Sequence, residues 1–313
     1  MDPRAQLLEA HAVGRAVTVG GIEQVRGQAL VQVRRSMGMN RQPPPPCQDP
    51  ELAYVDPDSV VRRIHGDLPS MLIGGLSALL FQMLHPLAMA GVTQHSNYRE
   101  DPLGRLERTA SFLGTTTFGT TYEAQAAIDR VRRVHGRVRG VAADGRPYAA
   151  SDPDLVSWVH AAEVSSFLAA SRAYAPEPPT PDEADDYLAQ MAVVATALGA
   201  VVVPRSTTEL DAYFAEVRPQ LHLTAEARTA RNFVLRGVGR WPHEIATYGL
   251  LVGAAQGVLP GWARRQLRLP SVPAGDRLAV RPSARLLGHA FRWVVAPPLR
   301  SVPSTGAVTL PTT

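Results

Sequence analysis

The sequence contains no lysine, so all 32 of its basic side chains are arginine and every positive side-chain charge is a guanidinium. This absence excludes enzymes that form a Schiff base through a lysine amine, and it excludes lysine as a metal ligand. Arginine stays protonated and has no lone pair to offer a metal. The net charge is only +4, and no basic run is interleaved with aromatic residues, so we expect no binding to nucleic acid.

Cysteine is nearly absent as well, because Cys47 is the only one in the chain. A disulfide framework and a cysteine-rich zinc or iron–sulfur site are therefore excluded. The phosphate-binding glycine loops, the HExxH zinc pair and the GxSxG hydrolase motif are missing too. The first residues include acids, arginines and a histidine where a secretory signal needs an apolar core, so we expect a cytoplasmic location.

One apolar stretch is long enough to cross a bilayer. Residues 71–92, MLIGGLSALLFQMLHPLAMAGV, carry no formal charge. Gln82, His85 and Pro86 interrupt the middle of this stretch, and such polar and helix-breaking groups suit a helix buried in protein better than one in lipid. We therefore expect a core helix and no stable membrane insertion.

Most of the chain has the pattern of successive helices separated by proline, glycine, aspartate and serine. In SDPDLVSWVHAAEV, for example, Ser151 or Asp152 is the expected N-cap and Pro153 takes the first turn. No stretch alternates in polarity as a half-buried strand does, so we expect an all-α protein. Its expected parts are an N-terminal arm with a proline-rich linker (1–50), a helical domain (51–298) and a disordered tail (299–313).

The stretch RVRRVHGRVRG, residues 130–140, places a single histidine among five arginines. At about 100° per residue, Arg132, His135 and Arg139 are expected along one helical face. None of the remaining histidines forms a metal-ligand pair at a recognised spacing. These are His11, His65, His85, His95, His160, His222, His243 and His289.

A second arginine cluster precedes this one, in RLERTASF, where Arg105, Arg108 and Thr109 share a helical face at i, i+3 and i+4. Two helices that each offer arginines suggest a large ligand with anionic ends. Haem fits this description, because one neutral imidazole binds the iron while arginines pair with the two propionates. Spacing alone leaves the commoner alternative open, in which both arginine faces are solvated and the histidine belongs to the core.

Four stretches, in this order, carry a family resemblance: GGLSALLFQMLHPLAMAGVTQHSNYREDPLGRLERTASFLGTTTFGT, VRRVHGRVRG, DGRPYAASDPDLVSWVHA and LPGWARRQLRLP. Through them the chain, from residue 60 to about residue 270, resembles the superfamily of haem b proteins that contains the oxygenase MpaB and rubber oxygenase, also called latex clearing protein. The resemblance implies an all-α, globin-like core around haem b, with His135 as the proximal iron ligand.

The resemblance also implies roles for the arginines. Arg105 and Thr109 match the flanking residues of a motif in which the rubber oxygenases carry a lysine that can ligate the iron from the distal side, and Arg108 stands at the position of that lysine. Arg132 and Arg139 match the arginines around the proximal histidine. Because arginine cannot ligate iron, we expect a sixth position that is open, or filled by water or another residue. A distal guanidinium would stabilise negative charge that develops there.

One feature departs from the rubber oxygenases, which use a distal glutamate as a base: residues 71–99 contain no acid. This difference argues against cleavage of rubber-type double bonds. We expect an oxygenase that uses haem b, O₂ and an electron donor to oxidise an apolar small molecule, such as an isoprenoid or a lipid-like metabolite. A haem-based sensor or carrier without turnover, and a helical partner-binding protein without haem, stay open. Gln82, His85 and His95 are either distal groups or ordinary core and turn residues.

Overall fold

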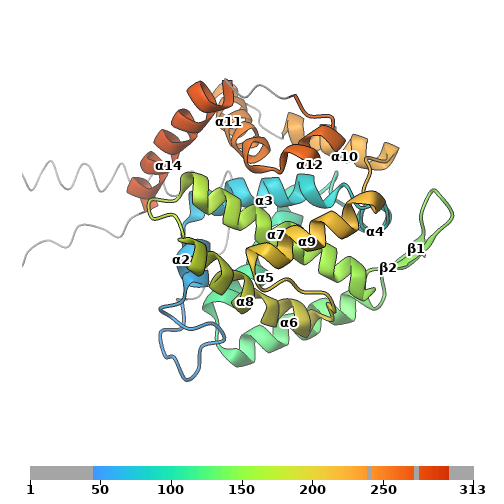
Figure 1. The fold of residues 1–313 in the computed structure, drawn as a ribbon, viewed down its shortest axis with the longest axis horizontal. Helices are drawn as coiled ribbons and strands as arrows, with labels where there is room; N and C mark the ends of the chain where they lie inside the picture. The colour runs from blue at the N-terminus through green and yellow to red at the C-terminus, as the bar shows by residue number, and fades with distance from the viewer. Residues whose placement is uncertain (1–44, 238–240, 271–274, 296–313) are drawn as a thin grey trace, which may run out of the picture.

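The computed structural model describes residues 45–237, 241–270 and 275–295, and these residues are predominantly helical (Figure 1). The all-α class predicted from the sequence is therefore confirmed. Most of the N-terminal arm and the whole predicted tail lie outside the described residues. The helices are α2 (Val60–Gly66), α3 (Leu68–Gln82), α4 (Pro86–His95), α5 (Pro102–Phe118), α6 (Thr121–His135), α7 (Pro153–Tyr174), α8 (Pro181–Leu198), α9 (Thr207–Val217), α10 (Ala225–Arg236), α11 (Pro242–Val258), α12 (Gly261–Gln266) and α14 (Arg281–Val295), with a 3-10 turn η1 (Arg218–Gln220) and a π-helical turn η2 (Asp276–Val280).

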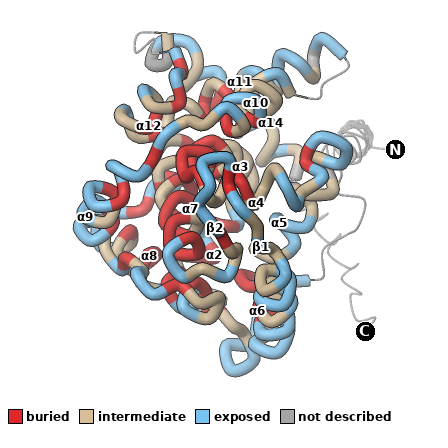
Figure 2. The backbone as a smooth tube through the Cα atoms, turned by 90° about the vertical axis from the view of Figure 1, so that its right-hand side faces the viewer, coloured by how far each residue is buried: buried red, intermediate tan, exposed pale blue. Residues whose placement is uncertain are grey.

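Two long helices, α3 and α7, pack against each other at the centre of the molecule, where Figure 2 shows much of the buried chain. They approach closely at Gly74, where a β-carbon would lie 2.7 Å from Cδ1 of Phe167. Trp158 of α7 is fully buried and meets the ring of Phe81 edge-on, with 5.2 Å between the ring centroids. Each large apolar side chain buried here contributes about 1.5–3 kcal/mol, so this helix pair forms the core.

The ends of α7 and α8 follow the local chemistry of the sequence. Asp152 caps α7 by accepting a hydrogen bond from the backbone N–H of Asp154 at 2.9 Å, as expected. Helix α8 begins with a capping box, in which Thr180 accepts from the backbone N–H of Glu183 and the Glu183 carboxylate accepts from that of Thr180. It ends at Gly199, whose φ of 106° favours glycine.

The apolar stretch 71–92 forms two helices where the sequence predicted one. Helix α3 ends at Gln82 and α4 begins at Pro86, because proline has no N–H to continue the first helix. The ring of His85 caps α4 by accepting from the backbone N–H of Ala88 at 3.5 Å. The predicted core position is correct, since Leu80, Phe81, Leu84 and Met89 are buried.

No single helix among the described residues is both long and apolar enough to cross a bilayer. Helices α2 and α3 reach that length and composition only as a pair, and they are bent by 87° relative to each other.

A small antiparallel hairpin follows α6 and was not predicted. Its strands are β1 (Arg139–Val141) and β2 (Pro147–Ala149). Tyr148 is buried, and its hydroxyl donates to Oε1 of Gln94 in α4 at 2.7 Å. A β-carbon at Gly140 would lie 2.6 Å from this hydroxyl, so glycine permits the close approach. Gly145, with a φ of 86°, completes the turn between the strands.

The C-terminal helices cover one end of the α3–α7 pair. Helix α11 packs against both, and η2 and α14 pack on α11 (Figure 1). Their contact is built from small residues, with Ala254 and Ala255 of α11 beside Ile73 of α3, and Ala284 of α14 in the same cluster. Small side chains let these helices approach closely without polar groups between them.

Candidate functional site

Helices α5 and α6 form a hairpin that carries most of the residues singled out by the sequence. Only Gly119 and Thr120 connect them, and the two helices contact each other. Thr120 begins α6 with a capping box, in which its N–H donates to Oε2 of Glu123 at 2.9 Å. The start of α5 and the end of α6 form the side of the hairpin away from the turn, each roughly 20 Å from it along its own helix at 1.5 Å per residue. We call this the open end.

Side chains on the packed faces of α5 and α6 are buried near the turn, while others near the turn, such as Tyr122, are exposed. Near the turn, Thr116 and Thr117 of α5 and Ala124 and Ile128 of α6 are buried. Towards the open end of α6 the side chains become accessible, and Val134 is 53% exposed.

His135 is the last residue of α6 and lies at the open end. Its ring is partly buried, and within the described chain it has no hydrogen-bond or ion-pair partner. Burial lowers the pKa of His135, so the ring is neutral near pH 7. A neutral imidazole with a free lone pair is the form that binds a metal.

Arg105 of α5 lies at the same end of the hairpin and is also partly buried. Burial lowers the pKa of Arg105, and the neighbouring Arg108 adds to this, while Tyr98 acts in the opposite direction. Arginine nevertheless stays charged. No carboxylate among the described residues pairs with this guanidinium, so it has donors available for an anionic group.

Arg108 and Thr109 are on α5 with Arg105, as the helical spacing predicted, but both are more exposed. Nη1 of Arg108 lies 3.4 Å from Oδ2 of Asp101, and the Arg108 side chain is 67% exposed. Asp101 also caps α5 by accepting from the N–H of Gly104 at 2.9 Å. The hydroxyl of Thr109 donates to the carbonyl of Arg105 at 3.1 Å.

The predicted helical face of Arg132, His135 and Arg139 is only partly correct. Arg132 and His135 are on α6, but the helix ends at His135 and Arg139 begins strand β1. The helical prediction fails at Gly136, because glycine has a low helix propensity and the chain that follows it pairs with β2 in the hairpin. Nη2 of Arg139 donates to the carbonyl of Gly136 at 2.6 Å, and Nη1 of Arg132 donates to that of Ala197 at 3.5 Å.

Several other histidines occupy structural positions. His85 caps α4 and packs against Trp158, and its pKa is lowered to about 4 by burial first and by Arg146 second. Nε2 of His95 lies 3.1 Å from the hydroxyl oxygen of Tyr148, within hydrogen-bond distance. His160 differs, because its Nε2 is buried without a partner and burial lowers its pKa to about 4. Among the described histidines, His160 is thus the main rival to His135 as a ligand.

A buried polar chain lies near the turn of the hairpin. His65 of α2 lies 2.7 Å through Nδ1 from the hydroxyl of Thr117, and 3.0 Å through Nε2 from the hydroxyl of Tyr187 in α8. Burial lowers the pKa of His65 to about 3, so the ring stays neutral. One ring nitrogen then donates and the other accepts, which orders the chain of hydrogen bonds.

Glu163 of α7 adds an acid to this region and was not singled out from the sequence. Its carboxylate acts electrostatically on Tyr187, and no hydrogen bond to it is seen in the described chain. Burial raises the pKa of Glu163 to about 7. A signal was present, since Glu163 stands in VHAAEVSSFLAA, a segment apolar on nearly all sides that predicts a fully buried helix.

Comparison with known families decides which protein class this geometry belongs to. A family model described as "ER-bound oxygenase mpaB/B'/Rubber oxygenase, catalytic domain" matches residues 62–293, from α2 into α14. The chain belongs to this family. Searches among curated proteins and among solved structures found no match. The mpaB/rubber oxygenase match confirms the predicted resemblance, and it identifies the helical region as an oxygenase catalytic domain.

The open end has the donor set that haem b needs. Within the described residues, no three His, Cys, Asp or Glu side chains are grouped closely enough to hold a metal by themselves. A porphyrin supplies four nitrogen ligands, so one histidine is sufficient. His135 offers a neutral imidazole without a competing partner, and Arg105 offers a partly buried guanidinium without a carboxylate. For a member of the mpaB/rubber oxygenase family, these residues fit the cofactor.

Proposed function

We propose that this protein is a haem b-dependent oxygenase that oxidises an apolar small molecule with O₂. The family match supports the oxygenase activity. The observation that supports haem is the pair at the open end: a neutral His135 and a charged Arg105, neither with a partner in the described chain. Leaving such groups partly buried and unpaired is costly unless a ligand satisfies them.

The residues of the hairpin have separate roles in this proposal. Haem supplies the oxygen chemistry when bound, with electrons from an external donor. His135 binds the iron and sets its electronic properties. Arg105 pairs with a propionate, and Arg132 and Arg139 do the same after exchanging their present carbonyl partners for it.

Arg108 and Thr109 would act on the reacting groups and would not hold the haem. Arg108 exchanges its exposed ion pair with Asp101 for a place near the reacting centre, where its guanidinium stabilises developing negative charge. Exposed pairs of this kind contribute only about 0–1 kcal/mol, so the exchange costs little. The Thr109 hydroxyl already donates to the carbonyl of Arg105, so its oxygen is left to accept a hydrogen bond from the substrate.

The apolar substrate class rests on the composition of the open end. Val134, which precedes His135, is exposed at the open end, whereas Leu113 lies nearer the turn and packs against the core. A substrate such as an isoprenoid or a lipid-like molecule would cover this surface without needing a charged contact.

The absorption spectrum of the purified protein tests the cofactor directly. The full chain, produced with a haem precursor in the medium, should show a Soret band and contain about one haem b per chain. A colourless protein that also fails to bind added hemin in a titration would overturn the haem proposal. Activity is a separate question, tested by O₂ uptake and product analysis with isoprenoid and fatty-alcohol probes in the presence of a ferredoxin-type donor.

A haem-based sensor or carrier is the second candidate, favoured by two features of the sequence. The chain has Arg108 where the rubber oxygenases have a lysine, and residues 71–99 contain no acid. A protein without these groups can hold haem and bind O₂ without consuming it. Stable O₂ binding with slow autoxidation and no product would favour this function over the oxygenase.

A further inference from the structure

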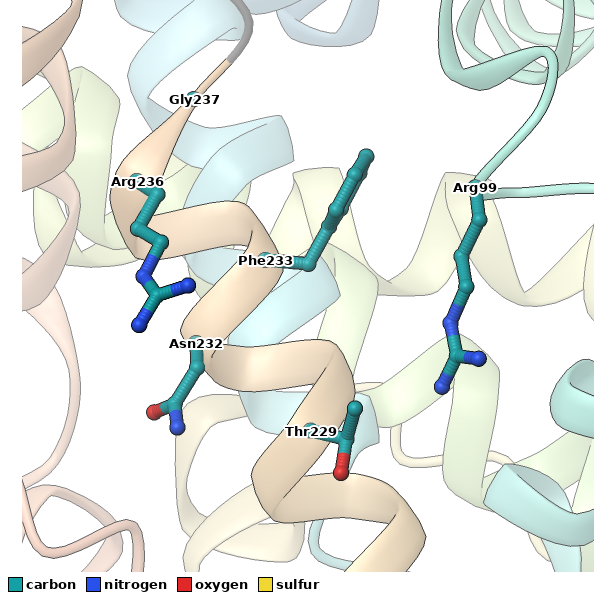
Figure 3. Close-up of a pocket in the computed structure, with 6 residues that line it drawn as sticks. All are labelled: Arg99, Thr229, Asn232, Phe233, Arg236 and Gly237. Carbon is teal, nitrogen blue, oxygen red and sulfur yellow. The ribbon is translucent and has the colours of Figure 1, made fainter.

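A pocket of about 340 Å³ lies between α10 and the connection from α4 to α5, apart from the polar chain near the hairpin turn. Figure 3 shows Thr229, Asn232, Phe233 and Arg236 on successive turns of α10, with Arg99 facing this helix from the neighbouring connection. Gly237 completes the lining where α10 ends. This volume is at the lower end of the range for small-molecule sites.

The two guanidiniums in this pocket are not neutralised by acids. Nε of Arg99 donates to the hydroxyl of Tyr98 at 3.0 Å, which leaves its terminal nitrogens free. The Arg236 side chain has no hydrogen bond or ion pair within the described residues. No acidic residue lines the pocket. The lining therefore carries two positive charges without a compensating negative charge.

The neutral polar groups add to this excess of donors. Oδ1 of Asn232 accepts from Nε and Nη2 of Arg231 at 3.1 and 2.7 Å, so the amide nitrogen is the part left to bond a ligand. The hydroxyl hydrogen of Thr229 is used in a bond to the carbonyl of Ala225 at 3.1 Å. A ligand in this pocket therefore meets mainly N–H donors, which an anionic oxygen satisfies.

One wall of the pocket is apolar. Phe233 packs edge-on against the buried Tyr98, with 5.8 Å between ring centroids, and this contact fixes the Phe233 ring. A purely inorganic anion would leave the ring uncovered. We propose that this pocket binds a small carboxylate that carries an apolar chain, with the chain on Phe233 and the carboxylate on Arg99. The exposed Arg236 side chain, which Figure 3 shows on the other side of α10, turns towards the carboxylate when the ligand binds.

This site is independent of the haem proposal, because none of its lining residues belongs to the hairpin. Tyr98 is a shared neighbour, since it bonds Arg99 and also acts electrostatically on Arg105. Binding of the carboxylate should therefore persist when His135 is replaced.

Isothermal titration of the full-length protein with octanoate tests the proposal, with octan-1-ol and inorganic phosphate as separate arms. Octanoate should bind more tightly than either. Arg236→Gln and Arg99→Gln should each weaken octanoate binding by about tenfold, the size of one hydrogen bond to a charged group. Arg228→Gln is the matched control, because it removes one exposed charge from the same helix outside the pocket, and it should change the affinity less than twofold.

Each contrary result has a distinct meaning. If octan-1-ol bound as tightly as octanoate, the arginines would not contribute to binding. If phosphate bound as tightly as octanoate, the apolar chain would not contribute. If octanoate affinity fell equally in the Arg228 and Arg236 variants, the loss would reflect the net charge of the protein and not a contact in the pocket. Loss of octanoate binding in His135→Ala would place the probe in the candidate haem site instead. Circular dichroism of each variant verifies folding, and Arg236, being exposed at a helix end, keeps the test valid if Arg99→Gln unfolds.

Discussion

Arg292 of α14 forms a two-pronged ion pair with Asp67, the residue between α2 and α3. Nε lies 2.6 Å from Oδ1 and Nη2 lies 2.8 Å from Oδ2, and Nη2 also donates to the carbonyl of Tyr174 at 2.9 Å. Both charged side chains are largely buried. Burial alone would raise the pKa of Asp67, but the hydrogen bonds from Arg292 and Ser70 outweigh it and lower that pKa. The C-terminal helix is thus tied to the corner before α3.

Replacing Arg292 by alanine should destabilise the protein by about 2–3 kcal/mol, because it leaves a largely buried carboxylate without its charged partner. Urea denaturation at pH 7 measures this difference. A depressed carboxyl pKa stabilises the fold above the unfolded pKa near 3.8, and this stabilisation is lost as the pH falls below it. The gap between the two proteins should therefore narrow in acid. Arg285→Ala, which removes only an exposed bond to Ala173, should cost far less.

His135→Ala should abolish stoichiometric haem binding, or leave it weak, if His135 is the iron ligand. His85→Ala should retain the Soret band, because that ring caps α4. His160→Ala is the sharper control, since its Nε2 is buried without a partner. Haem content by pyridine haemochromogen measures all three. Loss of haem in the His160 variant, with full retention in the His135 variant, would move the ligand to α7.

Arg105→Ala and Arg139→Ala should each weaken haem affinity by about 1.5–3 kcal/mol if these side chains pair with propionates. Transfer of haem to apomyoglobin gives the dissociation rates. Arg133→Ala is the matched control, because Arg133 is exposed on α6 and has no assigned role. Unchanged haem dissociation rates in both test variants would show that these arginines do not bind the propionates and belong to a solvated face.

Arg108→Lys should introduce a group that can ligate iron after losing its proton, whereas arginine cannot. We expect the wild-type ferrous protein to be high-spin and to bind carbon monoxide without displacing a side chain. The lysine variant should become partly low-spin if position 108 reaches the distal side. Resonance Raman spectroscopy of both proteins measures the spin state. A fully low-spin wild type would show that another side chain fills the sixth position, and the open-iron mechanism would be withdrawn.

Glu163→Gln should change how stability depends on pH. The pKa of Glu163 is raised from 4.5 to about 7. The stability that its protonated carboxyl contributes to the folded state is therefore fully present below pH 4.5 and is lost as the pH rises to about 7. As the pH rises between these values, the free energy of unfolding of the glutamine variant should therefore increase relative to that of the wild type by an amount on the order of 2–3 kcal/mol. Above pH 7 this difference should change no further. The lowered pKa of His65 acts in both proteins and cancels in the difference. Urea midpoints between pH 4.5 and 8 measure the effect, and a pH-independent difference would contradict it.

The sequence by itself determined the helical class, many helix ends and the family. Asp152, Thr180 and Gly199 act on backbone groups within a few residues of themselves, so their roles as caps can be predicted without knowing what packs nearby. Pro86 acts through the same local chemistry, but its effect was missed, because the sequence pattern predicted one helix over residues 71–92 where the structure has two. Helical spacing also placed Arg105, Arg108 and Thr109 together on α5 correctly.

Only the tertiary structure decided which side chains are paired, buried or left without a partner. Arg139 left the predicted face because β1 pairs with a strand that helical periodicity does not reveal. The pKa of Glu163 is raised because the helices packed around α7 bury it. Arg292 pairs with Asp67, although 225 positions separate them in the sequence. Caps depend on neighbours in the chain, whereas burial and pairing depend on neighbours in space, and those neighbours are set by how the elements pack.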